Sequence, residues 1–268
     1  MAGARDGQAK KERYKDMRKH LTLIFALGAV IAVTVAGVAL AAGEKPEVIR
    51  FGNLVFTING GVTPKALPKN KFAPIKLNVS GGIATVDGSQ PPALKEVIVD
   101  TDKNGMIEPK GVPTCTSGKL QAQDTKHAEA ACRSAIVGKG KTTVRVAFPE
   151  STPFNATGPL VVFNGGLKGG VTTLFIHAYV AVPTPTAIVT TVKITKEHKG
   201  RFGTHSVASV PVIAGGSGSP TSFSLAINRP GYLLAKCPTG NFVAQAEAIF
   251  RDGTKVKGGI VRKCTPKG

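Results

Sequence analysis

The chain has 268 residues, with 35 Lys and Arg side chains against 16 Asp and Glu, which gives a formal net charge of +19. This length allows one large or two small domains with their own hydrophobic cores, and the charge predicts attraction to anionic material. Trp is absent, and the only Tyr residues after position 42 are Tyr179 and Tyr232, which argues against an aromatic platform for stacking sugars or nucleobases.

Residues 1–20 form a basic segment that we expect to stay on the cytoplasmic side of a membrane. The segment holds seven Lys and Arg side chains and three acidic ones. It is followed by residues 21–42, which are 22 residues without a formal charge. As a helix, this apolar segment could cross the hydrocarbon layer of roughly 30 Å. The charge step predicts an export signal whose N-terminus remains inside.

The apolar segment, residues 21–42, has two interpretations, a cleaved signal peptide or an uncleaved membrane anchor. Its length favours an anchor, because the apolar core of a signal peptide usually has roughly 7 to 15 residues. Ala39 and Ala41, however, place small residues where signal peptidase requires them, and we prefer cleavage after Ala41. Both interpretations predict a protein that is secreted or lies on the extracellular face of the cell membrane.

The residues after position 42 alternate between apolar and polar side chains in the way that is typical of half-buried strands. Residues 144–148 and 223–227 show this alternation, and the apolar run 174–180 indicates a strand covered on both faces. About ten such strands favour an all-β fold, built as one antiparallel sandwich or as a pair of sandwiches. We expect a β-rich first half, residues 43–148, and a β-sandwich second half, residues 149–268, as two domains or as two layers of one.

Asp100, Asp102, Asn104 and Gly105 form the most specific local pattern in the chain. Their spacing matches the oxygen ligands and the turn glycine of a calcium loop, but Gly111 occupies the position of the bidentate carboxylate. The alternative is a hairpin, in which Asn104 and Gly105 form a tight turn between two short strands. We prefer the turn, expect at most weak Ca²⁺ binding by the first three residues, and predict no other cofactor.

All four cysteines lie beyond the apolar segment, and an even number in an exported chain predicts two disulfides. We expect the pairs Cys115–Cys132 and Cys237–Cys264, because each closes a short local loop. Each disulfide should stabilise the fold by about 3 to 4 kcal/mol on a chain-entropy estimate. The cysteine spacing does not suit a zinc site. The one stretch with helical periodicity, residues 120–136, would form a short helix attached through Cys132.

Several short strings in the chain carry a resemblance to a known group of proteins. They are Leu67-Pro-Lys, Phe72-Ala-Pro-Ile-Lys-Leu, Asp87-Gly-Ser-Gln-Pro-Pro-Ala-Leu-Lys-Glu, Asp100-Thr-Asp-Lys-Asn-Gly, Ala135-Ile-Val-Gly, Gly158-Pro-Leu-Val-Val-Phe-Asn-Gly, Ile213-Ala-Gly-Gly, Lys236-Cys-Pro-Thr-Gly, Asp252-Gly-Thr and Lys263-Cys-Thr-Pro. Together they resemble exported actinobacterial proteins of unknown function, over most of the chain after position 42. The resemblance implies an exported all-β protein and brings no catalytic or binding residues. The long basic N-terminus departs from that group.

Three classes of function are compatible with the sequence. We prefer an exported, non-enzymatic structural or binding protein of the cell envelope, because no nucleophile motif, metal cluster or cofactor loop is recognisable. The alternatives are a secreted hydrolase, which would need His177, His198 or His205 beside an acid and a hydroxyl group, and a polyanion-binding protein. We expect the membrane to be contacted through residues 21–42, and no specific nucleic acid to be bound.

Anionic cell-wall polymers are the expected partners of the part that follows the apolar segment. Seven of the 35 bases and three of the 16 acids lie in the first 20 residues, so 28 bases and 13 acids remain beyond them. Clustered lysines such as Lys255 and Lys257 would contribute to this attraction, which salt screens over a Debye length of about 8 Å at physiological ionic strength.

Export gives the first testable prediction. N-terminal sequencing of the protein recovered from outside the producing cells should begin at Ala42, because Ala39 and Ala41 satisfy the small-residue requirement of signal peptidase. Recovery of the intact chain from the membrane fraction, starting at Met1, would instead establish the anchor.

Overall fold

The computed structural model describes residues 45–181 and 184–268. The predicted basic segment, the apolar segment and the Ala39–Ala41 cleavage site lie outside these residues. Within the described residues, no helix is long and apolar enough to span a membrane. The described residues belong to one compact unit, in which the two predicted halves, 43–148 and 149–268, are not separate.

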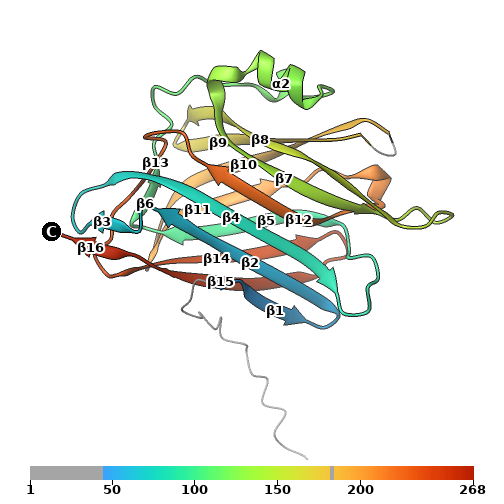
Figure 1. Cartoon of the computed structure of the whole chain (residues 1–268), viewed down its shortest axis with the longest axis horizontal. Helices are drawn as coiled ribbons and strands as arrows, with labels where there is room; N and C mark the ends of the chain where they lie inside the picture. Colours follow the sequence, from blue (N-terminus) through green and yellow to red (C-terminus); the bar gives the residue numbers. More distant parts are fainter. Residues whose placement is uncertain (1–44, 182–183) are drawn as a thin grey trace, which may run out of the picture. The chain divides into compact units, whose positions relative to one another are not determined.

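The described part is all-β with one short α-helix, as the sequence predicted (Figure 1). The strands before the helix are β1 (Glu47–Phe51), β2 (Leu54–Thr63), β3 (Ala66–Pro68), β4 (Ala73–Thr85), β5 (Leu94–Asp102) and β6 (Gly105–Ile107). Helix α2 (Thr125–Ala131) follows. The strands after it are β7 (Ile136–Val146), β8 (Phe154–Lys168), β9 (Val171–Val180), β10 (Thr186–Lys199), β11 (Phe202–Ser209), β12 (Gly218–Ile227), β13 (Leu233–Ala235), β14 (Asn241–Phe250), β15 (Lys255–Lys263) and β16 (Thr265–Lys267).

All the strands except β3 and β16 form one antiparallel sheet, where the sequence predicted one sandwich or a pair of sandwiches. Its order is β1-β2-β4-β12-β7-β8-β9-β10-β11-β5-β14-β15, with β13 paired to both β4 and β6. Strands β7 and β8, on either side of the predicted boundary at residue 148, are direct neighbours. The sheet curls until β15 lies beside β1 and β2, so the result is a nearly closed, barrel-like sheet (Figure 1). Strand β16 pairs with β3 in a separate parallel ladder.

Glycines allow the sheet to curl at the centre of this order. A Cβ atom added to Gly140 on β7 would lie 1.9 Å from the Ser224 carbonyl oxygen, and one added to Gly158 on β8 would lie 2.0 Å from the Tyr179 carbonyl oxygen. Neither position can accept a side chain, because the neighbouring backbones approach too closely. Glycines at defined strand positions are the usual device for curving a sheet.

The two end strands of the sheet are joined by side chains. Arg262 on β15 is buried, and its Nε donates to the Gly60 carbonyl oxygen on β2 at 2.6 Å. Its Nη2 donates to Asn59 Oδ1 at 3.0 Å and to the Lys45 carbonyl oxygen at 3.2 Å. Beside it, the Ile49 side chain from β1 occupies the space that a Cβ on Gly258 would need. We call this contact the Arg262 closure.

The interior of the curled sheet is filled by apolar side chains. The largest cluster combines residues from β4, β7, β8, β9, β10, β12 and β13 with Cys237 and Cys264. Tyr232 is fully buried within it and donates a hydrogen bond of 3.0 Å to Asn164 Oδ1, while Asn164 Nδ2 donates to the Val112 carbonyl oxygen at 3.0 Å. Tyr232 and Asn164 therefore satisfy each other's buried polar groups.

Both disulfides have the predicted connectivity, Cys115–Cys132 and Cys237–Cys264. Cys264 lies between β15 and β16, and the second disulfide adds to the cluster described above. No free cysteine is present among the described residues. Two disulfides in one compact unit are typical of proteins that fold in an oxidising compartment.

The helix is shorter than the predicted stretch 120–136. Ala122 has a positive φ of 58°, which an α-helix does not accommodate, so the helix begins only after Asp124. Asp124 caps it by accepting a hydrogen bond of 2.8 Å from the His127 backbone N–H, and Cys132 ends it outside helical geometry. Leu120, Ala128 and Cys132 pack beneath the helix with Val161 and Phe163 of β8, so β8 is covered on both faces.

The Arg262 closure gives a prediction for stability. Replacing Arg262 with Met removes its hydrogen bonds to the Gly60 carbonyl oxygen and to Asn59 Oδ1, and the free energy of unfolding should fall by about 2 to 4 kcal/mol. Urea denaturation followed by far-UV circular dichroism measures the change. Arg50→Met, at an exposed position on β1, is the matched control and should change stability by less than about 0.5 kcal/mol. Equal effects of the two substitutions would contradict the role given to Arg262.

Candidate functional site

Asp100 on β5 lies at the centre of a polar cluster on the outer face of the sheet. It is the direct cross-strand neighbour of His205 on β11 and of Gln245 on β14. Its Oδ1 lies 2.7 Å from His205 Nδ1, and its Oδ2 accepts a hydrogen bond of 2.7 Å from Gln245 Nε2. Because side chains alternate along a strand, Asp100 points away from the face on which Val97 packs into the interior.

Glu197 on β10 lies at the same place. It follows two residues after Thr195, the direct cross-strand partner of His205, so alternation puts Glu197 on the same face of the sheet as His205. One ligand atom each from Asp100, Glu197 and His205 lie within 4.8 Å of one another. Glu197 Oε2 is buried and has no hydrogen-bond partner among the described residues. We call this group the Asp100 cluster: Asp100, Glu197, His205 and Gln245.

The carboxylate of Asp100 is held in its charged form. Burial raises its pKa, but the hydrogen bonds from Gln245 and His205 and the charge of the nearby imidazole outweigh burial, so the net pKa is lowered. An Asp and a His in this arrangement could orient a base or hold a cation. A hydrolase would also need a nucleophilic hydroxyl group hydrogen-bonded to the His205 imidazole. No hydroxyl in the described part of the chain makes that hydrogen bond.

Asp102, the second residue of the predicted calcium pattern, has different partners from Asp100. Its Oδ1 accepts hydrogen bonds from the backbone N–H and the side-chain amide of Asn104, at 3.0 and 2.8 Å. Its Oδ2 accepts from Arg201 Nη2 and from the Val243 backbone N–H, each at 3.2 Å. Asp102 is thus already engaged by Asn104, Arg201 and Val243, and weak calcium binding by Asp100, Asp102 and Asn104 stays a prediction.

The segment around Asn104 forms a turn, but the predicted hairpin is wrong. Strand β5 pairs with β11 and β14, whereas β6, which follows the turn, pairs with β13. The chain therefore leaves one part of the sheet at Asn104 and enters another. Local sequence cannot indicate this, because both strands carry the same alternating pattern.

His177 on β9 is a buried structural residue. Its imidazole is fully buried, and Nε2 lies 2.9 Å from the Gln123 carbonyl oxygen, to which it must donate because a carbonyl only accepts. Its Nδ1 has no hydrogen-bond partner among the described residues. Burial lowers the pKa of His177, against the opposing effects of the Gln123 carbonyl and Asp124. His198, by contrast, is exposed and lies outside the Asp100 cluster.

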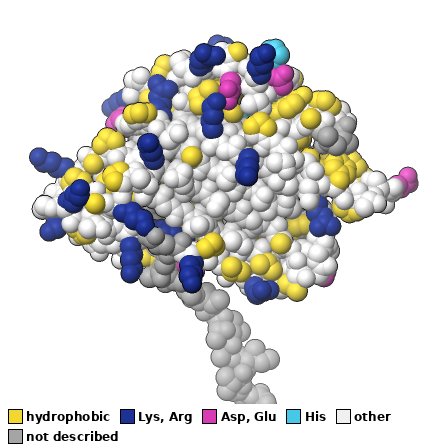
Figure 2. Space-filling view, viewed as in Figure 1, with side chains coloured by type: hydrophobic (Ala, Val, Ile, Leu, Met, Phe, Trp, Pro, Cys, Tyr) yellow, Lys and Arg dark blue, Asp and Glu magenta, His cyan; other side chains and the backbone are white. Residues whose placement is uncertain are grey.

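A shallow hollow lies on the outer surface over strands β2, β4, β12, β7 and β8, which face the viewer in Figures 1 and 2. It has a volume of about 530 Å³ and is open to solvent. Short hydroxyl and amide side chains line most of it, and the described residues that line it include no acid and no histidine. The lining residues, which we call the polar hollow, are Pro46, Thr57, Asn59, Ser80, Gly81, Gly82, Lys141, Thr143, Thr157, Ser222, Phe223 and Ser224.

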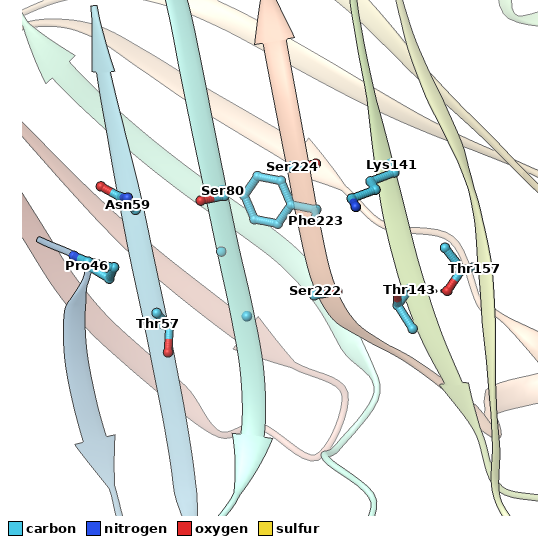
Figure 3. Close-up of a pocket in the computed structure, with 12 residues that line it drawn as sticks. Pro46, Thr57, Asn59, Ser80, Lys141, Thr143, Thr157, Ser222, Phe223 and Ser224 are labelled. Atoms are coloured by element: carbon cyan, nitrogen blue, oxygen red, sulfur yellow. Dashed lines mark hydrogen bonds between the residues drawn. The ribbon is translucent and has the colours of Figure 1, made fainter.

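Phe223 supplies an aromatic surface in the polar hollow. Its side chain is 39% exposed, and it pairs across the strands with Gly81. A Cβ on Gly81 would lie 2.6 Å from Phe223 Cε1, so a side chain at position 81 would displace the ring. Figure 3 shows the ring directed from β12 toward β4 and the Lys141 side chain extending from β7 toward it. Sequence reasoning missed Phe223, because its strand pattern does not show that the partner residue is glycine.

Basic side chains surround this face of the molecule. Figure 2 shows more Lys and Arg than acidic side chains on it, with the acidic ones toward the margins. Lys141 lines the polar hollow itself. Lys257, which the sequence suggested for anion binding, lies on β15 with its Nζ 3.2 Å from Glu247 Oε2. Lys141 lines the same hollow as the Phe223 ring, so it is better placed than Lys257 to bind an anionic group of a ligand that also contacts the ring.

Comparison with models of protein families, with curated proteins and with solved structures finds no match for this chain.

The buried imidazole of His177 predicts a pH dependence of stability. Because its pKa is lowered from 6.5 in the folded state, the unfolded chain binds the proton more readily, and stability should fall as pH decreases below about 6.5. His177→Gln keeps an N–H donor but cannot titrate. The variant should therefore lose less stability than the parent between about pH 7.5 and 5.5 in urea denaturation. His127→Gln, on the exposed face of α2, is the control and should lose stability with pH as the parent does. A His177→Gln variant that also parallels the parent would contradict the prediction.

Proposed function

We propose that this protein is an exported, non-enzymatic binding protein of the cell envelope, which binds an extended, hydroxyl-rich and anionic wall polymer in the polar hollow. The observation that carries the proposal is the exposed Phe223 ring, which lies against Gly81 and lines the polar hollow together with Ser, Thr and Asn residues. Two features support location outside the cytoplasm, namely the two disulfides and the charge step before the apolar segment. The resemblance to exported actinobacterial proteins agrees with that location.

The chemistry of the polar hollow suits a glycan. A sugar ring presents C–H groups on its face and hydroxyl groups at its edge, so it can stack on an aromatic ring while its hydroxyls bond to short polar side chains. Thr57, Asn59 and Ser80 offer such groups on one side of Phe223, and Thr143 and Thr157 offer them on the other (Figure 3). Thr143 and Thr157 are already oriented by a hydrogen bond of 3.0 Å between their hydroxyls.

The dimensions of the site suit an extended chain of sugars more than a single small molecule. The polar hollow crosses five neighbouring strands, β2, β4, β12, β7 and β8. At about 4.8 Å between strands, this surface is about 20 Å wide, which is room for several sugar units. The openness of the hollow means that a polymer could pass across it without its ends being enclosed.

The charge of the site indicates an anionic polymer. Lys141 is the one charged side chain among the described residues that line the polar hollow. The absence of an acid or a histidine from that lining also favours binding over hydrolysis, since general acid–base chemistry requires such groups. Electrostatic attraction from the surrounding bases would raise the rate of encounter and make binding sensitive to salt.

Binding to purified cell-wall material tests this proposal. Phe223→Ala should reduce retention on cell-wall glycan about tenfold, because stacking on an aromatic ring contributes about 1 to 2 kcal/mol. Lys141→Gln should reduce retention at low salt and have less effect at moderate salt, where the charge is screened. Sedimentation of the protein with insoluble wall preparations, over a range of salt concentrations, gives both numbers.

Phe72→Ala is the matched control, because Phe72 is 40% exposed, close to the exposure of Phe223, and stacks under Lys236 away from the polar hollow. It should retain binding. Circular dichroism checks that each variant is folded. Loss of binding in the Phe72 variant equal to that in the Phe223 variant, or turnover of a glycan or ester substrate by the parent protein, would overturn the proposal.

A further inference from the structure

We propose that the Asp100 cluster is a binding site for a divalent transition-metal ion of the Zn²⁺ type, separate from the polar hollow. The ligands would be a carboxylate oxygen of Asp100, a carboxylate oxygen of Glu197 and the Nδ1 atom of His205, which come from β5, β10 and β11. Glu197 and His205 lie on the two strands of one hairpin, and Asp100 joins them because β11 also pairs with β5, which is distant in the sequence.

The donor set decides the class of ion. One imidazole nitrogen and two carboxylate oxygens match the ligands that Zn²⁺ accepts, with a solvent molecule completing four-coordination. Ca²⁺ and Mg²⁺ prefer oxygen ligands only, and a site for them does not use imidazole. The nitrogen donor therefore distinguishes this site from the oxygen pattern of Asp100, Asp102 and Asn104.

The buried carboxylate oxygen of Glu197 is the observation that points to a ligand. A buried carboxylate oxygen without a hydrogen bond is costly, and Glu197 Oε2 has no partner among the described residues. The Lys199 Nζ atom lies 3.8 Å from the other oxygen, Oε1, and the Lys199 side chain is 82% exposed. An ammonium group so placed compensates the Glu197 charge weakly, whereas a bound cation would satisfy it directly.

The geometry needs only small side-chain adjustments to close around an ion. Ligand atoms around a tetrahedral Zn²⁺ lie about 3.3 to 3.6 Å apart. The present separations range from 2.7 Å, between Asp100 Oδ1 and His205 Nδ1, to at most 4.8 Å among the three ligand atoms. Rotation about the bonds of the long Glu197 side chain would shorten the larger distance, and the Asp100–His205 hydrogen bond would open by under about 1 Å to admit the ion.

Gln245 provides the orienting contact outside the ligand shell. Its Nε2 donates to Asp100 Oδ2, which leaves Oδ1 directed at His205. Hydrogen bonds of this kind fix the orientation of metal ligands, and their removal typically weakens metal binding 10- to 100-fold. Gln245 is thus a positioning residue of the proposed site.

Competition of the full-length protein with a chromogenic chelator for Zn²⁺, in mild detergent to keep the apolar N-terminal segment soluble, tests the proposal. We expect one equivalent of Zn²⁺ bound with a Kd of about 10 µM or tighter. His205→Ala and Glu197→Gln should each weaken this binding at least about tenfold, and Gln245→Ala should weaken it about 10- to 100-fold. Co²⁺ bound in place of Zn²⁺ should give a visible absorption band that His205→Ala abolishes.

Two histidines outside the cluster provide matched controls. His198→Ala removes an exposed imidazole next to Glu197 in the sequence. His127→Ala removes an imidazole that, like His205, pairs with an aspartate: its Nδ1 lies 2.9 Å from Asp124 Oδ2. Both variants should keep the Zn²⁺ affinity of the parent. Thermal unfolding without metal identifies any variant that is not folded, and Zn²⁺ should raise the unfolding temperature of the parent but not of the His205 variant.

Three results would overturn the proposal. The first is an absence of stoichiometric Zn²⁺ binding by the folded parent protein. The second is binding that survives in folded His205→Ala or that disappears in folded His127→Ala. The third is tight Ca²⁺ binding that does not depend on His205, which would assign the ion to oxygen ligands around Asp100 instead. None of these results depends on whether a glycan binds the polar hollow.

Discussion

The structure depends on the contact that joins the two ends of its single sheet. Strands β1 and β15 are the ends of the order, and they meet through side chains: Arg262 donates hydrogen bonds to β2, and Ile49 fills the space above Gly258. An open sheet edge exposes unpaired backbone groups and invites association with other chains. The Arg262 closure links the two edges through side-chain contacts where no backbone ladder joins them, around an interior in which Tyr232 and Asn164 satisfy each other.

Closure of the sheet also decides where function can lie. The interior is occupied by apolar side chains and the buried polar groups among them, so a ligand must bind on an outer face. Two outer regions differ in character. The region over β2, β4, β12, β7 and β8 is open, hydroxyl-rich and uncharged except for Lys141. The region over β10, β11, β5 and β14 carries the Asp100 cluster, with two carboxylates and an imidazole.

A glycine shapes one of these regions, and strand pairing places the other. Gly81 lets the Phe223 ring lie against β4, and a residue with a side chain at that position would displace it. Thr195 on β10 is the direct partner of His205, and Glu197 follows two residues later, so alternation puts Glu197 on the same face as His205. The pairing of β11 with β5 then brings Asp100 to the same place.

The sequence by itself determined the local features of this protein. Alternating side chains in 223–227 and the apolar run 174–180 indicated strands. Cysteine spacing predicted the pairs Cys115–Cys132 and Cys237–Cys264, because short loops close at the least entropic cost. Only the tertiary structure decided that one sheet closes in place of a sandwich and that Phe223 is exposed. It also decided that Asp100 contacts His205 and Gln245, which lie 105 and 145 residues further along the chain. The physical reason is that period-two alternation specifies which face a side chain occupies but not which strand becomes its neighbour, and that choice is made by backbone pairing over long sequence distances.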